Sequence, residues 1–319
     1  MSPTPLTALS PLDGRYHGKV DALRDIFSEF GLIRRRVQVE VAWLKALSEC
    51  ADIAEVPVFS SESTNLLDRI VSEFDEAQAE AVKAIEATTN HDVKSVEYFL
   101  KEALSGNPEL NAVGEFVHFG CTSEDINNLA HALMIRDGHC VIVKHYEAVR
   151  DALADLAQAH AEQPMLSRTH GQAATPTTLG KELANVVMRL NRQLAAANAI
   201  QPMGKMNGAV GNYNAHLVAY PDVDWPALSE RFVSGLGIEW NPYTTQIEPH
   251  DYYIVFLGSE NYSNTLLQEF DKSIEDSNIP LIQLNRDFDY KKADTVFLAL
   301  PHEVSNNFVK IYYDKIQII

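Results

Sequence analysis

The chain has 319 residues, of which 46% are hydrophobic and 22% charged, as expected for a globular protein with a sizeable core. Its formal net charge of −18 argues against nucleic acid as the main partner, because neutralising phosphates requires basic patches. A small anionic ligand stays possible wherever cations converge locally.

The cysteines and the N-terminus give little sign of export or of metal binding. Cys50, Cys121 and Cys140 are scattered and form no CxxC spacing, so neither a disulfide framework nor a zinc site is predicted. No basic segment followed by an apolar one opens the chain, and no apolar run reaches membrane-spanning length. We therefore expect a cytoplasmic protein with no membrane partner.

Apolar residues recur every three or four positions through most of the chain, which predicts helices. In chain order, the pattern predicts helices over residues 20–50, 63–89, 91–105, 126–163 and 178–200. The last two are long, and long helices favour a bundle over a compact α/β fold. The fold class predicted for this part is mainly α, a bundle of long helices.

The composition changes near residue 251. Residues 252–319 hold 11 of the 28 aromatic residues and only two alanines, and their short apolar runs predict strands with helical material between them. We therefore expect an N-terminal helical domain over 1–110, a central helical-bundle segment over 111–251, and a short α/β tail over 252–319.

Four polar clusters lie at the edges of predicted helices, and the first two come early in the chain. "SPLDGRY" (residues 10–16) ends in Arg15 and Tyr16, and an arginine can hold a carboxylate or phosphate in a bidentate pair. Taken alone, a solvated turn explains it better. "TTNHDVKSVEYF" (88–99) places Asn90, His91 and Asp92 before a helix, with Asn90 or Thr89 as the expected N-cap. Capping and ligand binding explain this second cluster about equally well.

The other two clusters carry hydroxyls and a histidine. "GCTSEDINNLAHAL" (120–133) places Thr122 and Ser123 at the start of a long helix, where Thr122 and Asp125 approximate a capping box and free N–H groups can hold an anion. "SRTHGQ" (167–172) places His170 among donors, and histidine is the usual general acid or base near neutral pH. A lone histidine is more often structural, but four such clusters in one helical chain favour function.

Two further stretches complete the pattern. "GKMNGAVGNYNAH" (204–216) is rich in glycine and asparagine, and "NPYTTQIEPHD" (241–251) contains Gln246. Neither GxGxxG nor GxxxxGK[ST] is present, so no phosphate-binding fingerprint supports a nucleotide cofactor.

Six motifs together closely resemble the bacterial adenylosuccinate lyases, a family of the aspartase/fumarase superfamily. In chain order they are "SPLDGRY", "TTNHDVKSVEYF", "HFGCTSEDINNLAHAL", "SRTHGQAATPTTLGKELANV", "KMNGAVGNYNAH" and "WNPYTTQIEPHD". The resemblance runs from about residue 5 to residue 251. It implies a homotetramer around a long helical bundle, with active sites built from several subunits. It implies neither a metal nor an organic cofactor.

The resemblance also implies a reaction and its residues. The family eliminates fumarate from adenylosuccinate, giving AMP, and from the succinylcarboxamide ribotide SAICAR, giving AICAR, in the purine pathways that make IMP and AMP. By motif, His170 matches the general acid that protonates the leaving nitrogen. The substrate-binding positions of the family match Arg15, Tyr16, Asn90, His91, Asp92, Thr122, Ser123 and Gln246.

One family feature is absent from these 319 residues. The base of the family is a serine on a loop with a signature close to GSSxMPxKxNP, and no segment of the chain resembles it. We therefore expect the chain as given to be catalytically dead or nearly so. "ADTVFLALPHEVSNNFVK" in the tail resembles part of the nucleotide-binding domain of N-acetyl-γ-glutamyl-phosphate reductase, without its catalytic cysteine. The alternatives are a non-catalytic binding or assembly relative, an enzyme for another succinyl substrate such as argininosuccinate, and a chimeric or truncated reading frame.

Overall fold

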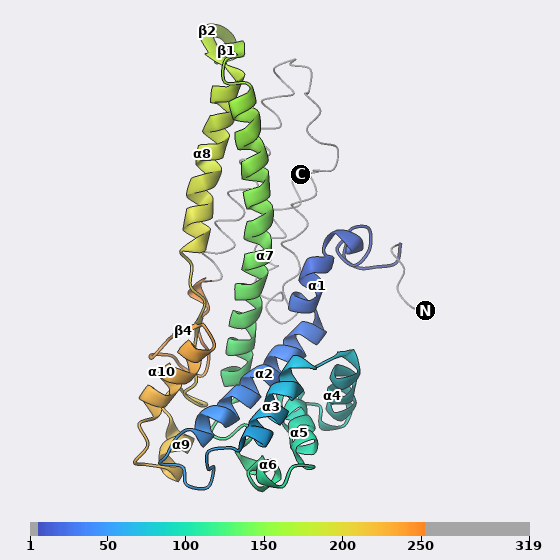
Figure 1. The fold of residues 1–319 in the computed structure, drawn as a ribbon, viewed down its shortest axis with the longest axis vertical. Helices are drawn as coiled ribbons and strands as arrows, with labels where there is room; N and C mark the ends of the chain where they lie inside the picture. Colours follow the sequence, from blue (N-terminus) through green and yellow to red (C-terminus); the bar gives the residue numbers. More distant parts are fainter. Residues whose placement is uncertain (1–5, 253–319) are drawn as a thin grey trace. The chain divides into compact units, whose positions relative to one another are not determined.

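The computed structural model describes residues 6–252, and these are mostly helical, which confirms the predicted class (Figure 1). The α/β structure expected for the tail falls on residues 253–319, outside the described part. The helices are α1 (Asp21–Phe27), α2 (Glu29–Ser48), α3 (Ser61–Ser72), α4 (Glu76–Thr89), α5 (Asp92–Leu104), α6 (Pro108–Ala112), α7 (Ser123–Ala159), α8 (Leu179–Asn198), α9 (Asn214–Ala219) and α10 (Trp225–Gly235), with short 3₁₀ turns at His17–Lys19 and Gly114–Phe116.

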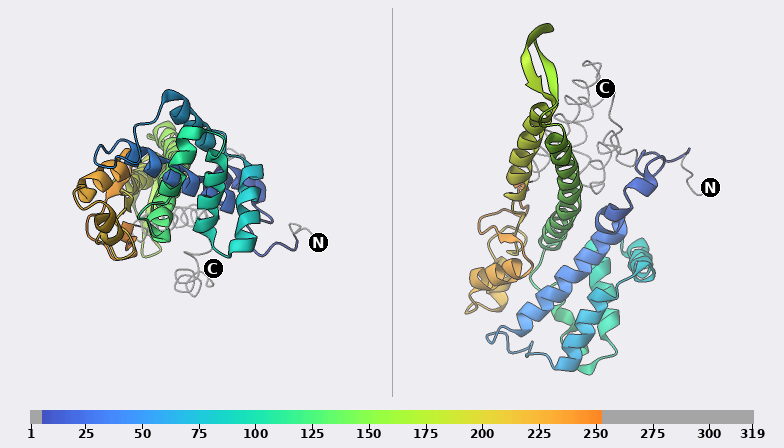
Figure 2. Two further views of the ribbon diagram at one scale, coloured as in Figure 1. Left: turned by 90° about the horizontal axis from the view of Figure 1, so that it is seen from below. Right: turned by 45° about the horizontal axis from the view of Figure 1, so that its top comes forward.

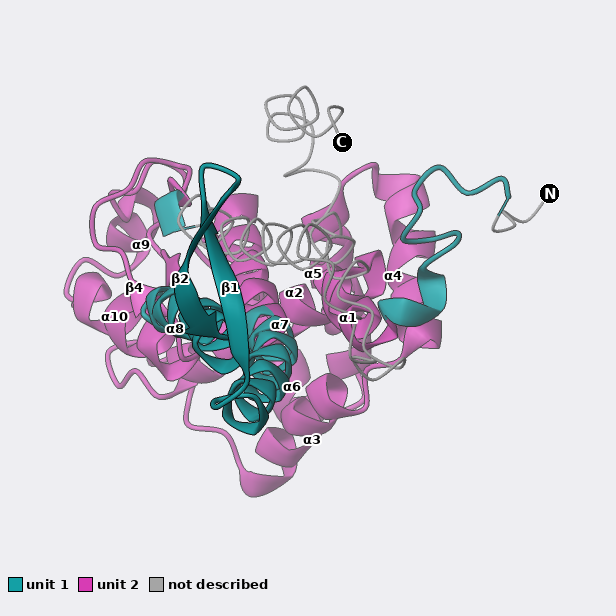
Figure 3. Ribbon diagram, turned by 90° about the horizontal axis from the view of Figure 1, so that it is seen from above, with its two compact units in different colours: residues 1–20, 139–200, 251–299 teal, residues 21–138, 201–250, 300–319 magenta. Residues whose placement is uncertain are grey.

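The described residues belong to two compact units (Figure 3). Unit 1 includes residues 6–20, 139–200 and 251–252, and unit 2 includes residues 21–138 and 201–250. Helix α7 contributes its first part to unit 2 and the remainder to unit 1. The domain boundaries expected near residues 110 and 251 stay predictions.

Two helices that the periodicity predicts as continuous are each divided by a local cap. Ser28 accepts a hydrogen bond from the backbone N–H of Gly31 and so begins α2. Asp75 and Gln78 exchange side-chain to backbone bonds of 2.9 and 3.0 Å, a capping box that begins α4. The prediction of unbroken helices over 20–50 and 63–89 was wrong at these points, because polar side chains near the backbone offset the apolar pattern.

The mostly aliphatic core of unit 2 contains an aromatic cluster. Trp43 of α2 is fully buried and donates its indole N–H to the carbonyl of Phe119 at 3.0 Å. Its ring lies 5.0 Å from that of Phe232 and 6.5 Å from that of Trp225, both on α10. The core thereby fixes α2, α10 and the segment before α7 relative to one another.

In unit 1, the later part of α7 runs antiparallel to α8, as the separate views agree (Figure 2). His139 bonds Asn198 at 3.2 Å near one end, and the N–H of Gly180 donates to the carbonyl of His160 at 2.9 Å at the other. A Cβ on Gly180 would lie 2.3 Å from the carbonyl oxygen of Ala157. Glycine is therefore required for this close approach.

A β-hairpin joins these two helices. Strand β1 (Pro164–Thr169) pairs antiparallel with β2 (Gln172–Thr178), and the turn consists of His170 and Gly171, with φ of 51° and 76°. Positive φ at both turn residues is the type I′ arrangement that suits strand twist. The sequence did not predict this hairpin. Two strands of two residues each, β3 (Met203–Gly204) and β4 (Glu239–Trp240), form a small parallel sheet in unit 2.

Candidate functional site

Three of the predicted site residues belong to unit 1. His170 is exposed at the tip of the β-hairpin. Arg15 is exposed near the N-terminus, and its guanidinium lies 5.2 Å from the centre of the Tyr16 ring. The other predicted site residues, from Asn90 to Gln246, belong to unit 2.

The second polar cluster forms the turn between α4 and α5. Asn90 ends α4 in the left-handed region, with φ of 52°. His91 is the N-cap of α5, because its Nδ1 accepts from the N–H of Lys94 at 3.2 Å. The prediction that Asn90 or Thr89 caps this helix was wrong. The imidazole of His91 accepts the capping hydrogen bond, a role for which a short polar side chain was expected.

Asp92 is tied to α2 through a buried arginine. Arg36 donates to Asp92 Oδ2 at 2.5 Å and to Asn127 Oδ1 at 2.8 Å, and only 4% of its surface is exposed. Burial raises the pKa of Asp92, but the attraction of Arg36 and the N–H of Val93 outweigh it, so the pKa is lowered. Arg36 thus connects the start of α5 to the first turns of α7.

The third cluster begins α7, where Asp125 takes the role expected of a capping-box partner. Its Oδ2 accepts from the N–H of Thr122 at 2.8 Å, which supplies half of the predicted capping box. Its Oδ1 accepts from the N–H of Asn207 at 3.0 Å and of Gly208 at 3.3 Å, and lies 3.0 Å from Lys205 Nζ. The glycine- and asparagine-rich stretch is therefore built onto the start of α7.

The turn before Thr122 is packed against a buried histidine. Gly120 has φ of 73°, and a Cβ there would lie 2.4 Å from Nε2 of His216. His216 is fully buried, and its ring lies 4.7 Å from that of Trp225. Burial lowers its pKa to about 4, so the ring is neutral at pH 7. Glycine is the residue that this contact and this backbone conformation require.

The last segment, residues 241–250, joins the same region. Asn207 Nδ2 donates to Thr244 Oγ1 at 2.8 Å, two residues before the exposed Gln246. Nε2 of His250 lies 3.3 Å from Glu124 Oε1 on α7, and its Nδ1 lies 2.8 Å from Glu248 Oε2. The structure thereby brings the start of α5, the start of α7 and the Gln246 segment into one part of unit 2.

The imidazolium of His250 should make stability depend on pH. Burial lowers its pKa, but the bonds to Glu124 and Glu248 outweigh burial and raise it to about 9, above the ordinary 6.5. Its contribution is complete below pH 6.5 and is lost as the pH rises through 9. We expect His250→Gln to remove about 3 kcal/mol of unfolding free energy at pH 6 and far less at pH 9.5.

Urea unfolding across this pH range, with His145→Gln as the control, measures that difference. His145 is exposed on α7. A deficit of the His250→Gln chain that stays equal at pH 6 and pH 9.5 would contradict the assigned ion pairs.

The region of unit 2 has the chemistry to bind an anion. Helix N-termini offer N–H groups and the positive end of the helix dipole, and Thr122 and Ser123 add hydroxyl donors at the start of α7. Such donors can stabilise negative charge that grows on a carboxylate. Among residues 6–252, no group of three or more His, Cys, Asp and Glu side chains is arranged to hold a metal ion. No helix in that range is long and apolar enough to cross a membrane.

Several residues of this region are not found by reading the sequence. Arg36 and Lys205 acquire their roles from partners far along the chain: Asp92 is 56 residues from Arg36, and Asn128, which accepts from the N–H of Lys205, is 77 residues from it. The motif "GKMNG" pointed to the segment of Lys205 but not to its burial.

Solved structures share this fold. A fumarate lyase from Mesorhizobium sp. BNC1 superposes with a TM-score of 0.65 at 24% identity, over 80% of this chain and 56% of that one. A β-carboxy-cis,cis-muconate cycloisomerase from Acinetobacter calcoaceticus superposes with a TM-score of 0.67 at 20% identity, over 92% and 65%.

Sequence comparison gives much stronger similarity. Adenylosuccinate lyase of Escherichia coli (strain K12) is 56% identical over 270 residues, which cover 84% of this chain and 59% of the relative. That of Haemophilus influenzae is 57% identical over 270 residues, with the same coverage. That of Buchnera aphidicola from Acyrthosiphon pisum is 44% identical over 310 residues, covering 96% and 66%. The chain thus spans about 59% of the length of the first two relatives.

A family model described as lyase (Lyase_1) matches residues 14–275, which is most of the chain and reaches past the composition change near residue 251. The fold, the motifs and this match agree, and the chain belongs to the Lyase_1 family of lyases.

Proposed function

We propose that the chain binds adenylosuccinate, and by the same chemistry SAICAR, for the β-elimination of fumarate. The observation that carries the proposal is the convergence in unit 2 of the His91 turn, the Thr122–Ser123 turn and the Gln246 segment, the motifs that resemble the adenylosuccinate lyases. Arg15 and Tyr16 would add contacts to the substrate, and His170 would protonate the leaving nitrogen.

Ligand binding should stabilise the chain against heat. Binding to the folded state alone adds about 2.7 kcal/mol of unfolding free energy at a ligand concentration of 100 Kd. We expect adenylosuccinate and AMP to raise Tm. Thr122→Val should reduce that rise, because the isosteric side chain removes the hydroxyl and leaves the backbone bond to Asp125 in place. Differential scanning fluorimetry measures the change in Tm. The absence of a rise with either ligand in the unmodified chain would contradict the proposal.

The proposed assembly is a homotetramer with sites built from several copies, and the proposed location is the cytoplasm. The family resemblance supports both. If His170 of one copy and Thr122 of another contact the same ligand, a mixed oligomer of His170→Ala and Thr122→Ala chains contains some intact sites. Mixed and refolded chains should therefore bind adenylosuccinate more tightly than either variant alone. Equal weakness of the mixture and of both variants would count against shared sites.

The non-catalytic binding or assembly relative is the second candidate function. Measuring fumarate release beside substrate binding separates it from the proposed lyase. It predicts the same substrate affinity without turnover.

A further inference from the structure

Helix α2 presents two charged side chains, one turn apart, to the interior of unit 2. Arg36 is 4% exposed and Glu40 is fully buried. Residues four apart lie on one face of a helix, so both side chains leave α2 in the same direction. Neither belongs to a motif that resembles the family. Arg36 bonds the second and third polar clusters, and Glu40 bonds His118, which lies just before the third.

Arg36 holds the start of α5. Its guanidinium donates to Asp92 at 2.5 Å and, from another nitrogen, to Asn127 on α7 at 2.8 Å. A planar guanidinium with two partners fixes direction as well as distance. The turn that contains His91 is therefore oriented relative to the first turns of α7.

Glu40 holds the segment that leads into α7. Its Oε1 lies 2.6 Å from Nδ1 of His118, and His118 has φ of 64°, in the left-handed region. Burial lowers the pKa of His118, but the bond to Glu40 outweighs it and the pKa is raised. A non-glycine residue in that region is strained and persists when its surroundings enforce it. Four residues later the chain reaches Thr122.

Burying charges is a poor way to gain stability. The desolvation penalty of a buried ion pair often equals or exceeds the attraction, and apolar replacements of the pair can be neutral. What Arg36 and Glu40 supply is direction, since each fixes one turn through a bond of defined geometry.

We propose that Arg36 and Glu40 are positioning residues, which set the His91–Asp92 turn and the Thr122–Ser123 turn at the mutual orientation that one anionic substrate requires. The inference rests on the proposed function for its ligand. It extends that function to two residues that do not themselves contact substrate.

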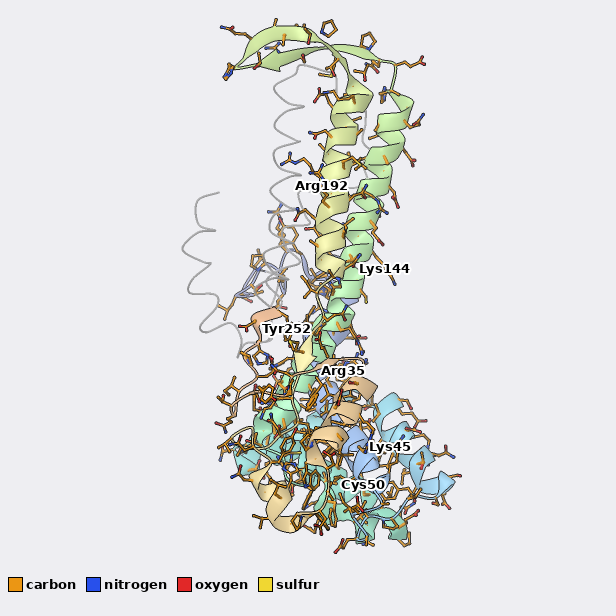
Figure 4. The ribbon with its side chains drawn as sticks, turned by 90° about the vertical axis from the view of Figure 1, so that its left-hand side faces the viewer. Arg35, Lys45, Cys50, Lys144, Arg192 and Tyr252 are labelled. Atoms are coloured by element: carbon orange, nitrogen blue, oxygen red, sulfur yellow. The ribbon has the colours of Figure 1, made fainter. Side chains whose placement is uncertain are left out.

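The test compares substrate affinity with stability in matched variants of the full chain. Arg36→Met and Glu40→Leu remove the bonds. Glu40→Gln keeps an acceptor for His118. Arg35→Met is the control, because Arg35 (labelled in Figure 4) is the neighbour on α2, bonds Gln38 at 2.6 Å and pairs with Asp137.

We expect the Kd for adenylosuccinate, measured by calorimetry, to rise about tenfold or more in Arg36→Met and Glu40→Leu. It should change less than about threefold in Glu40→Gln and Arg35→Met. Urea midpoints of Arg36→Met and Arg35→Met should be similar. If Arg36→Met does not fold, Arg36→Lys replaces it, because a lysine keeps the charge but lacks the planar guanidinium that bonds two partners. The affinity of Arg36→Lys for adenylosuccinate should fall severalfold. Affinity that falls only in step with stability in every variant would overturn the inference.

Hydrogen exchange separates this inference from the proposed function. Backbone amides of residues 91–95 and 118–125 should exchange faster in Arg36→Met and Glu40→Leu than in Arg35→Met. If the unmodified chain does not bind adenylosuccinate, the proposed function fails, and exchange alone decides the positioning. Equal exchange of these segments in all variants would then reject it.

Discussion

Replacing Asp125 by alanine should lower the free energy of unfolding by about 3–5 kcal/mol. The carboxylate is fully buried and accepts from the backbone N–H groups of Thr122, Asn207 and Gly208. It also pairs with Lys205 Nζ at 3.0 Å. Its removal leaves two buried N–H donors and one partly buried N–H donor unsatisfied, and a buried ammonium without its counter-charge. Urea unfolding measures the loss.

The two members of this pair should not be equivalent. Lys205→Met should cost about 1–3 kcal/mol, because the Asp125 carboxylate keeps its three N–H donors. Lys83→Ala, which removes an exposed pair with Glu29, should cost less than about 1 kcal/mol and serves as the control. An Asp125→Ala chain as stable as Lys83→Ala would show that Asp125 does not hold the start of α7.

The 319-residue chain should release fumarate from adenylosuccinate at least about 10²–10⁴-fold more slowly than the Escherichia coli relative assayed beside it. Elimination needs an acid and a base. We propose His170 as the acid, and no segment of these 319 residues resembles the serine loop that carries the family's base. Removing a proton from carbon is the harder step. The change in ultraviolet absorbance on forming fumarate measures the rate.

The Escherichia coli relative must convert adenylosuccinate in the same assay, because it is the positive control for this comparison. Turnover of the 319-residue chain within tenfold of the relative would mean that another of its side chains removes the proton.

The helices were predictable because their periodicity is local. The long runs over 126–163 and 178–200 correspond to α7 and α8 to within a few residues. The hairpin over 164–178 was missed because neither face of it is buried, so its strands show no alternation of apolar and polar residues. The His170–Gly171 turn was the only local signal, and His-Gly is not among the Asn-Gly, Asp-Gly and Gly-Gly pairs that usually mark a two-residue hairpin turn.

The predicted site residues mark turns, and turns can be recognised from neighbouring residues. The contacts that join the turns to one another cannot be recognised in this way. Arg36 and Glu40 lie within an apolar-periodic helix, and their partners are 56 and 78 residues away. Asp125 was predicted as a capping partner of Thr122, which is confirmed in part. Its pairing with Lys205 depends on how the chain folds back onto α7.

Calorimetric titration of the full chain with adenylosuccinate, and in parallel with argininosuccinate, tests the central claim most directly. Both ligands carry a succinyl group, so the comparison isolates recognition of the nucleotide. We predict saturable binding of adenylosuccinate, weakened by Thr122→Val, and at least about tenfold weaker binding of argininosuccinate. Equal binding of the two ligands, or binding of neither, would contradict the account.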